Sequence, residues 1–248
     1  MNDDEKVKRL LKFAKEIHPR DLFPVLEEEA ALLIEENPFA FAVAAVLDRG
    51  TKSEIIWTIP YYIQKQFGRF TPRFFADKSV EDLGGILRSL PGKPRFINAA
   101  PRTLKELSEI VVNEYDGKVQ KIWENQTSKK VRATFERIYG VGPGISSMAV
   151  LLLEECFGIS FHDSDHRNMD VKPDTHIVRV FYRLGFITKP DRVSATKAAR
   201  RLKPDYPRVL HGPTWVIGKK WCTPAAPQCN RCPLDDVCPK NGVQTSQR

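Results

Sequence analysis

The stretch YGVGPG at residues 139–144 decides the fold, because it joins two segments with helical apolar periodicity, 129–138 and 145–157. Glycines permit the tight path of a short connection between two helices. They also let backbone N–H groups face outward at the start of the second helix, where such groups form a nest for a phosphate. The alternative is an ordinary glycine-rich connection without a ligand. The predicted phosphate-binding residues of this hairpin are Gly140, Val141, Gly142, Gly144 and Ser146.

Helical periodicity also dominates the rest of the chain, and no run shows the alternating pattern of a strand. Glycine and proline breaks separate the periodic segments, as expected at helix ends. The sequence therefore predicts an all-α protein. The segments read as amphipathic helices are 7–17, 38–47, 55–67, 80–90, 102–115, 129–138, 145–157 and 175–184.

Four cysteines close the chain in a C-x6-C-x2-C-x5-C ladder: Cys222, Cys229, Cys232 and Cys238. Four thiolates within so short a segment are typical of one shared metal centre. A zinc ribbon usually repeats two C-x2-C knuckles, whereas this ladder has one and wider gaps around it. We therefore predict a [4Fe-4S] cluster, with structural zinc and disulfides as alternatives. The fifth cysteine, Cys156, lies in an apolar run and is read as a core residue.

The 248-residue chain carries a formal charge of +8 that is unevenly distributed. Residues 1–36 hold six Lys or Arg and ten Asp or Glu, a net −4, so the other 212 residues hold 33 against 21, a net +12. A basic body suits a polyanionic partner, although solubility alone is the alternative. Apolar runs reach about ten residues, whereas a bilayer needs about 20. The charged N-terminus and reduced thiols predict a cytoplasmic protein with no membrane partner.

Three stretches, in this order, resemble the helix-hairpin-helix (HhH-GPD) DNA glycosylases of the endonuclease III type. They are the hairpin, DTHIVRV at 174–180, and GKKW at 218–221 running into the cysteine ladder. The resemblance extends over about residues 37–238. It implies two helical lobes and a [4Fe-4S] cluster loop. The implied domains are a helical barrel at 37–156 that ends in the hairpin, and a second lobe made of 1–36 and 157–248 that carries the loop at 216–240.

The resemblance also implies a chemistry for Asp174. A carboxylate in this position lies beside a base flipped out of duplex DNA, where it stabilises oxocarbenium character as the N-glycosidic bond breaks. Capping of the following helix is the alternative role. Gly144 stands where bifunctional members have a nucleophilic lysine, so we expect a monofunctional glycosylase. The alternatives are a lyase that uses another amine, such as Lys172, and a non-catalytic DNA-damage-binding protein.

Further contacts with DNA follow from the same resemblance. Arg49 stands where endonuclease III proteins have a glutamine that fills the gap left by the extruded base, although a plain surface arginine is equally consistent with the sequence. Lys219 and Lys220 are expected to reach the DNA backbone. The implied partner is double-stranded DNA with a lesion or mismatch, bound by a monomer. The base pocket is expected to include Gly50, Thr51, Tyr139 and His162.

The segment 159–173 is polar and aperiodic, and it is long for a loop inside a compact domain. It lengthens the path from the hairpin to Asp174. We expect a solvated loop that shapes the damage pocket, with a second metal site as the alternative. The acidic segment 1–36 is expected to face away from DNA. The candidate metal ligands of the loop are His162, Asp163, Asp165, His166 and Asp170.

Overall fold

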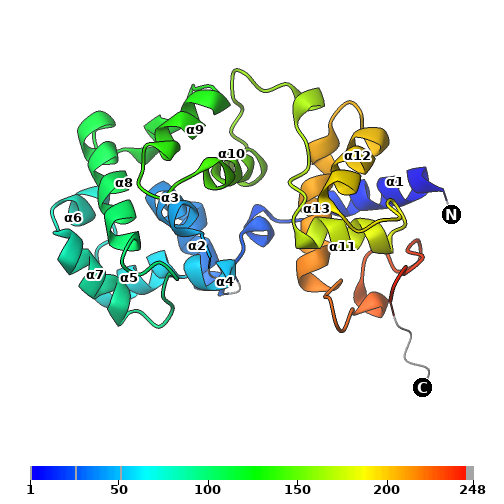
Figure 1. Cartoon of the computed structure of the whole chain (residues 1–248), viewed down its shortest axis with the longest axis horizontal. Helices are drawn as coiled ribbons and strands as arrows, with labels where there is room; N and C mark the ends of the chain where they lie inside the picture. Colours follow the sequence, from blue (N-terminus) through cyan, green and yellow to red (C-terminus); the bar gives the residue numbers. More distant parts are fainter. Residues whose placement is uncertain (1, 26, 51, 244–248) are drawn as a thin grey trace. The chain divides into compact units, whose positions relative to one another are not determined.

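The computed structural model describes residues 2–25, 27–50 and 52–243 (Figure 1). All regular structure in these residues is helical, which confirms the predicted all-α class. The chain forms two compact units: unit 1 comprises residues up to Leu22 and from Ser164 on, and unit 2 runs from Phe23 to Asp163. The two boundaries between the units lie after residues 22 and 163, whereas the sequence predicted them after residues 36 and 156. The reason is that helix α2 and the residues just after α10 pack into the core of unit 2.

Unit 2 contains nine α-helices in the residues described and one short 3₁₀ helix. They are α2 (Glu28–Glu36), α3 (Pro38–Leu47), α4 (Ser53–Ile56), α5 (Ile59–Phe67), α6 (Pro72–Ala76), α7 (Val80–Ser89), α8 (Ala100–Glu114), η2 (Val119–Ile122), α9 (Ser128–Glu136) and α10 (Pro143–Phe157). The segment predicted as one helix at 55–67 is broken into α4 and α5, because Pro60 occupies the first turn of α5. Proline is well tolerated there and starts a new helix.

Helix α3 is the centre of unit 2. Its sequence, PFAFAVAAVL, is apolar on every side, and the residues from Phe39 to Leu47 are each no more than 3% exposed. A helix with this composition is stable only when neighbours cover it all round. Helices α2, α5, α8 and α10 pack against it (Figure 1). Asn37 starts the helix by accepting hydrogen bonds from the amides of Phe39 and Ala40 at 3.0 and 3.2 Å.

The predicted helical hairpin is formed by α9 and α10, which pack against each other. Residues 137–142 connect them, and Gly140 adopts a left-handed conformation with φ of 78°. Gly142 is the N-cap residue of α10, and its carbonyl accepts from the amides of Ile145 and Ser146 at 3.0 and 3.1 Å. Helix α10 ends at Gly158, which is also left-handed. The glycines therefore lie where the chain turns, as the sequence indicated.

Unit 1 combines the start of the chain with its last third. Its helices are α1 (Asp3–Ala14), η1 (Pro19–Leu22), η3 (His166–Asn168), α11 (Thr175–Arg183), α12 (Arg192–Leu202), η4 (Pro207–Leu210), α13 (His211–Lys220) and η5 (Cys229–Arg231). Helices α11 and α13 pack closely, and α1 packs on α12, α13 and η4. The apolar periodicity of the sequence did not single out α2, α12 or α13 as helices.

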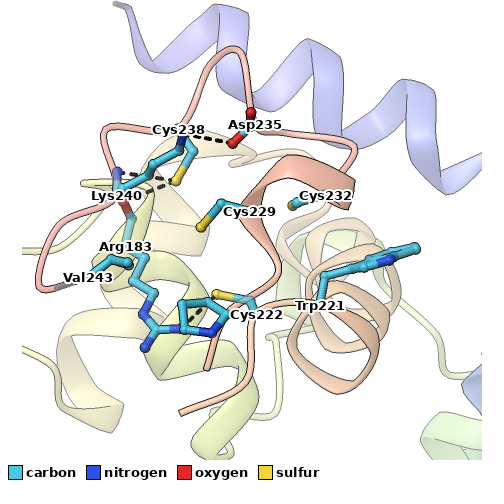
Figure 2. A pocket seen from close by; sticks show the side chains of 10 residues that line it. Arg183, Trp221, Cys222, Cys229, Cys232, Asp235, Cys238, Lys240 and Val243 are labelled. Carbon is cyan, nitrogen blue, oxygen red and sulfur yellow. Dashed lines mark hydrogen bonds and ion pairs between the residues drawn. The ribbon is translucent and has the colours of Figure 1, made fainter. Parts of the chain in front are cut away.

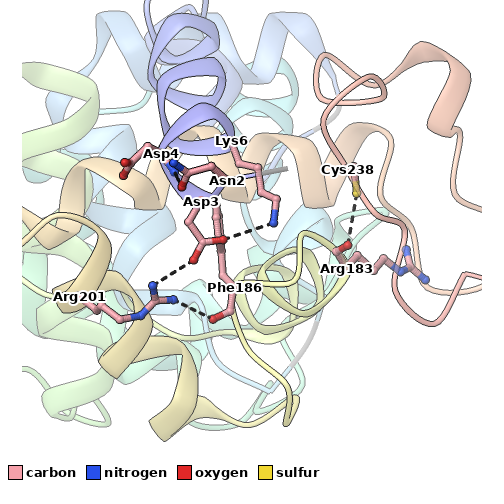
Figure 3. Close-up of polar contacts among 8 residues, drawn as sticks. All are labelled: Asn2, Asp3, Asp4, Lys6, Arg183, Phe186, Arg201 and Cys238. Atoms are coloured by element: carbon pink, nitrogen blue, oxygen red, sulfur yellow. Dashed lines mark hydrogen bonds and ion pairs between the residues drawn. The ribbon is translucent and has the colours of Figure 1, made fainter.

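The acidic N-terminal residues pair with basic residues of unit 1 (Figure 3). Asp3 accepts from Arg201 Nη1 at 3.0 Å and from Lys6 Nζ at 3.3 Å, and Arg201 Nη2 also donates to the carbonyl of Phe186 at 3.2 Å. Burial raises the pKa of Asp3, but the hydrogen bonds from Arg201 and Lys6 outweigh it, so the pKa lies below its ordinary value. Asp21 pairs with Lys220 at 2.6 Å. These carboxylates thus join α1 and η1 to the C-terminal part of unit 1.

No single helix in the described part of the chain is long and apolar enough to cross a membrane. Helices α2 and α3 reach the required length only as a pair, and they bend by 114° where they meet. The residues of α3 are buried in the core of unit 2.

We expect opposite effects of one added methyl group at two helical glycines. A Cβ at Gly218 in α13 would lie 2.7 Å from Cβ of His176, so Gly218→Ala should cost about 1–3 kcal/mol of unfolding free energy by overpacking. A Cβ at Gly85 in α7 meets nothing within 4 Å, so Gly85→Ala should add about 0.5–1 kcal/mol. Urea unfolding followed by circular dichroism measures both. A neutral Gly218→Ala would contradict the close packing of α11 on α13.

Candidate functional site

Helix α8 holds the first residue of the glycine connection by both of its backbone polar groups. The N–H of Tyr139 donates to Glu106 Oε2 at 2.7 Å, and its carbonyl accepts from Thr103 Oγ1 at 2.8 Å. The guanidinium of Arg102 lies 4.1 Å from the centre of the Tyr139 ring and donates to Glu106 at 2.7 Å. The path of the hairpin is therefore fixed by a helix that is distant in sequence. Tyr139, a predicted pocket residue, is 42% exposed.

The side chain of Arg49 lies directly over Gly140. An ideal Cβ on Gly140 would be 1.4 Å from Arg49 Nη1, so any side chain there would displace the guanidinium. Arg49 Nη2 donates to Thr103 Oγ1 at 2.8 Å, and the guanidinium lies 5.7 Å from the ring centre of Phe96. Desolvation by burial lowers the pKa of Arg49. Arg49 is thus a half-buried cation held by Thr103 and Phe96, and not a free surface arginine.

The loop that carries Arg49 is anchored at the end of α3. The Asp48 carboxylate accepts from Trp57 Nε1 at 2.9 Å and from Ser53 Oγ at 3.0 Å. Gly50 is left-handed, with φ of 70°, and an ideal Cβ on it would lie 2.8 Å from Phe96 Cε2. Phe96 is 48% exposed, a residue that the sequence analysis missed; its signal is a large aromatic residue in a turn-rich stretch. Thr51, predicted beside Gly50, lies outside the described residues.

The residues predicted to bind a phosphate through the hairpin do not share one environment. Gly142 and Gly144 open into free space, since an ideal Cβ on either meets nothing within 4 Å. Val141 is 6% exposed, and its amide donates to the carbonyl of Ile138 at 3.0 Å. Ser146 is fully buried and donates to Glu136 at 2.5 Å. Val141 and Ser146 thus have hydrogen-bond partners inside the protein, and a phosphate contact from either residue stays a prediction.

Asp174 is the N-cap residue of α11. Its Oδ1 accepts from the amides of His176 and Ile177 at 2.8 and 2.9 Å. Both bonds end on Oδ1, so Oδ2 is not part of the cap. The residue is partly exposed, and a negative charge at a helix N-terminus is favoured by the exposed amides of the first turn. The capping role is therefore present and leaves one carboxylate oxygen for chemistry.

Arg179 joins α11 to the residues that enter the cysteine ladder. Its Nε donates to the carbonyl of Cys222 at 2.7 Å, and its Nη2 donates to the carbonyl of Gly218 at 2.9 Å. The same Nη2 lies 3.0 Å from His176 Nδ1. Because a guanidinium only donates, this contact places the imidazole proton on Nε2. Desolvation by burial lowers the pKa of Arg179.

The four cysteines of the ladder surround one space (Figure 2). They line a pocket together with residues of α11 and of the segment after the ladder. The cysteines of the described chain are present as free thiols. Burial raises the pKa of the Cys232 thiol to about 11 and also raises the pKa of Cys238. The further lining residues are Arg183, Trp221, Pro227, Asp235, Lys240 and Val243.

Arg183 holds the first turn of the cysteine loop from within the core. It is 8% exposed, and Nη1 donates to Cys222 Sγ at 3.3 Å and to the carbonyl of Thr223 at 2.7 Å. Nη2 donates to the carbonyl of Pro224 at 2.9 Å. The carbonyl of Arg183 in turn lies 3.3 Å from Cys238 Sγ, so one residue contacts both ends of the ladder. Nothing in the sequence indicated that Arg183 contacts both ends of the cysteine ladder.

At the far end of the ladder, Lys240 lies beside Cys238. Its amide approaches Cys238 Sγ at 3.4 Å, and its ammonium pairs with Asp235 at 2.7 Å. The hydrogen bond with Asp235 raises the pKa of Lys240.

The fifth cysteine, Cys156, is not part of the ladder. Burial raises the pKa of its thiol well above the ordinary value, in agreement with an inert residue packed against the core.

The loop at 159–173 uses its carboxylates for structure. Asp163 accepts from the amides of Ser128 and Lys129 at 2.5 and 3.1 Å, at the start of α9. Burial raises the pKa of Asp163, but these amides outweigh it and the net shift is downward. Asp170 accepts from Arg200 at 2.7 and 2.5 Å. The residues described include no group of three or more His, Cys, Asp or Glu arranged as a single-ion site.

The remaining predicted contacts have their own partners. The ring of His166 stacks on Tyr206 with centres 4.3 Å apart, while His162 is exposed and its amide donates to the carbonyl of Gln126 at 3.2 Å. The ammonium of Lys219 lies 5.1 Å from the ring of Trp215. Lys220 is the partner of Asp21 described above, so it can reach DNA only by leaving that ion pair.

No family model matches the chain. Curated relatives include endonuclease III homologs 2 and 1, both chloroplastic, from Arabidopsis thaliana. They are 23% and 25% identical over 97% and 85% of this chain, which covers 59% and 51% of them. Endonuclease III of Thermotoga maritima is 23% identical over 82% of this chain and 84% of its own length. Over most of its length the chain is thus similar in sequence to proteins of the endonuclease III type.

Solved structures show the same fold. A non-covalent endonuclease III-DNA complex superposes with a TM-score of 0.58 at 21% identity, over 97% of both chains. A thermostable thymine-DNA glycosylase superposes with a TM-score of 0.55 at 18% identity, over 94% of both chains. The chain spans little more than half the length of the two Arabidopsis relatives. These structural likenesses show the fold alone, so the activity of this chain must be argued from its own residues.

Replacing Arg183 should loosen the cysteine loop. Arg183→Ala removes the donors to three partly buried acceptors, and we expect a loss of about 1–3 kcal/mol of unfolding free energy, with faster proteolysis between Cys222 and Cys238. Arg231→Ala is the matched control, because Arg231 is exposed in the same loop and contacts only the nearby Gln228 side chain among the contacts described. Equal stability of the two variants would contradict the role of Arg183. Thermal unfolding and limited proteolysis measure the difference.

Proposed function

We propose that this protein is a DNA glycosylase that removes a damaged or mismatched base from duplex DNA by hydrolysing the N-glycosidic bond. The observation that carries the proposal is the carboxylate of Asp174, fixed by two amides at the start of α11 in a chain with the endonuclease III fold. The similar proteins support this class of activity, since they are endonuclease III proteins by sequence and include a thymine-DNA glycosylase by structure.

Asp174 supplies the electrostatics that this reaction needs. Departure of the base builds positive charge on the deoxyribose, and a carboxylate held in place stabilises that charge without reorganising. The cap holds Oδ1, so Oδ2 is available to face the sugar or to orient a water molecule. The target nucleotide must leave the base stack first, because its glycosidic bond is inaccessible within a duplex.

The hairpin supplies affinity for the backbone. No side chain at Gly142 or Gly144 blocks the approach to the start of α10, where the helix dipole favours an anion such as a phosphate. The net charge of +8 adds sequence-independent attraction to DNA. The proposed partner is therefore a duplex that contains a lesion or mismatch, bound through its backbone by unit 2.

Water, rather than a protein amine, is the proposed nucleophile. Residue 144, the position of the attacking lysine in bifunctional relatives, is glycine, and its surroundings are open space. The expected product is an abasic site with an intact strand. A lyase reaction would need an amine from elsewhere in the chain.

The cysteine cavity fits a [4Fe-4S] cluster. Its donor set is four thiols, which is the ligand set of an iron-sulfur cubane. Buried thiols with raised pKa values become thiolates only beside compensating positive charge, which an iron-sulfur core supplies. When bound, the group cross-links Cys222, Cys229, Cys232 and Cys238, and its role here is structural. Iron and acid-labile sulfide analysis of the purified protein distinguishes the cluster from zinc.

The central test is Asp174→Asn. Asparagine caps a helix as well as aspartate does, so the fold and iron content should persist while base excision falls on the order of 10²–10³-fold. The measurement is single-turnover strand cleavage after hot alkali, on a panel of duplexes that each carry one modified base. Asp191→Asn, at the N-cap of α12, is the matched control and should retain activity. Undiminished excision by Asp174→Asn, or no excision of any lesion despite tight binding, would overturn the proposal.

A gain of function tests the role of position 144. We expect Gly144→Lys to form a borohydride-trapped covalent complex with abasic DNA, because the open space there accommodates the side chain and supplies the missing amine. The wild-type protein and Gly144→Met, which has a side chain of similar length without an amine, should not be trapped. Trapping of the wild type would show that another amine acts and would contradict the monofunctional assignment.

A further inference from the structure

Arg183 is a buried cation whose described contacts include no carboxylate. The residue is 8% exposed, and its guanidinium donates to the carbonyls of Thr223 and Pro224 at 2.7 and 2.9 Å. It also donates to Cys222 Sγ at 3.3 Å (Figure 2). Carbonyl oxygens satisfy its N–H groups but do not neutralise its charge, and a buried charge without an opposite charge is strongly unfavourable. Among the contacts described, the sulfur of Cys222, as a thiolate, is the group that can supply the opposite charge.

A second arginine makes the surroundings of Arg183 more positive. Arg179 lies one turn earlier on α11, and both guanidinium groups reach the start of the cysteine loop. Burial lowers the pKa of Arg179, and the nearby charge of Arg183 also lowers it. The two arginines therefore repel each other where α11 meets the ladder. Negative charge in the pocket beside Cys222 offsets this repulsion.

Lys240 places a third cation at the other end of the ladder, but in a different setting. Its amide lies 3.4 Å from Cys238 Sγ, and its left-handed conformation, with φ of 60°, is one that residues other than glycine rarely adopt. Its ammonium pairs with Asp235 at 2.7 Å, and the Lys240 side chain is 36% exposed. The charge of Lys240 is therefore balanced by a carboxylate and screened by solvent, whereas the charge of Arg183 is neither.

These contacts have a defined effect on a group held by the four thiolates. One-electron reduction of an iron-sulfur cluster adds negative charge to it. A cation beside the cluster and an N–H donor at a ligand sulfur both stabilise the more negative state, so both raise the reduction potential. A buried cation has the larger effect because water and salt screen it less. Arg183 provides both features at Cys222.

We propose that Arg183 is the buried counter-charge of the cluster in this pocket and raises its one-electron reduction potential. The inference rests on the proposed [4Fe-4S] cofactor and goes beyond the structural role of that group. In the step concerned, one electron passes from an external one-electron donor, such as an electrode, to the cluster. No bond to the protein forms or breaks, and Arg183 keeps its proton. The residue acts through its charge and through the N–H group that it donates to Cys222.

The test is the reduction potential of the purified holoprotein, measured by protein-film voltammetry. Arg183→Gln removes the charge and keeps an amide donor, so the equilibrium constant for reduction should fall about tenfold or more, which corresponds to a potential about 59 mV lower. Arg183→Lys keeps the charge but loses the fork of donors to Thr223 and Pro224, so it should retain most of the wild-type potential. Arg231→Gln is the matched control, because it removes the same charge from an exposed site in the same loop and should change the equilibrium less than about twofold.

A salt series separates the buried cation from the exposed one. Lys240→Gln should lower the potential by less than Arg183→Gln does, and its effect should vanish at about 1 M salt, where exposed charges are screened within about 3 Å. The effect of Arg183→Gln should persist at this salt concentration because the guanidinium is buried. Equal effects of the two variants under both conditions would contradict the inference.

Iron and sulfide analysis of each variant comes first, because a purely structural role of Arg183 predicts different results. Loss of iron from Arg183→Gln but not from Arg183→Lys supports the counter-charge, since both variants lose bonds to the loop and differ in charge. Equal loss from both, equal lowering of the potential by both, or a wild-type potential in Arg183→Gln would each overturn it. Zinc in place of iron would reject the cofactor proposal together with this inference, whereas an iron-loaded protein that excises no base would reject only the glycosylase proposal.

Discussion

Burial of α3 on all sides is the constraint on which unit 2 depends. The side chains of PFAFAVAAVL are all apolar, so this helix is stable only when α2, α5, α8 and α10 cover it on all sides. Two of these neighbours, α8 and α10, carry the polar groups of the candidate site. The loop that leaves α3 at Asp48 is tied to Trp57, and the next residue is Arg49. The apolar core and the cationic site are thus consequences of a single packing arrangement.

In unit 1 the cysteine loop needs support from outside, because it is short and has few apolar residues of its own. Two arginines on one face of α11, Arg179 and Arg183, hold the backbone where the chain enters the loop. Burial of an arginine lowers the free energy of unfolding unless its N–H groups have acceptors. Here the carbonyl of Cys222 accepts from Arg179, and the carbonyls of Thr223 and Pro224 accept from Arg183. The DTHIVRV segment therefore combines two tasks on one helix: Asp174 begins it, and its arginines support the cysteines at its other end.

Much of the fold was predictable from local sequence. The all-α class, the hairpin at residues 139–144 and the grouping of four cysteines each depend on patterns that a short window contains. Contacts between distant segments were not predictable in this way. The approach of Arg49 to Gly140 and the support of Tyr139 by α8 arise only when α3, α8 and the hairpin are packed together. The hydrogen bond from the Ser146 hydroxyl to Glu136, ten residues earlier on a facing helix, was likewise not predictable from a short window. Lys220 was assigned without its partner Asp21 for the same reason.

The division of unit 1 into two distant segments has a consequence for the order in which the protein matures on the ribosome. Unit 2 is continuous, so it can become compact as soon as residue 163 has emerged. Helix α1 is synthesised well before its partners Arg201 and α13, which appear about two hundred residues later. Until then its apolar face is without a permanent partner. The later segment therefore completes the earlier one, and the four cysteines of the ladder, which follow α13, emerge only after unit 2.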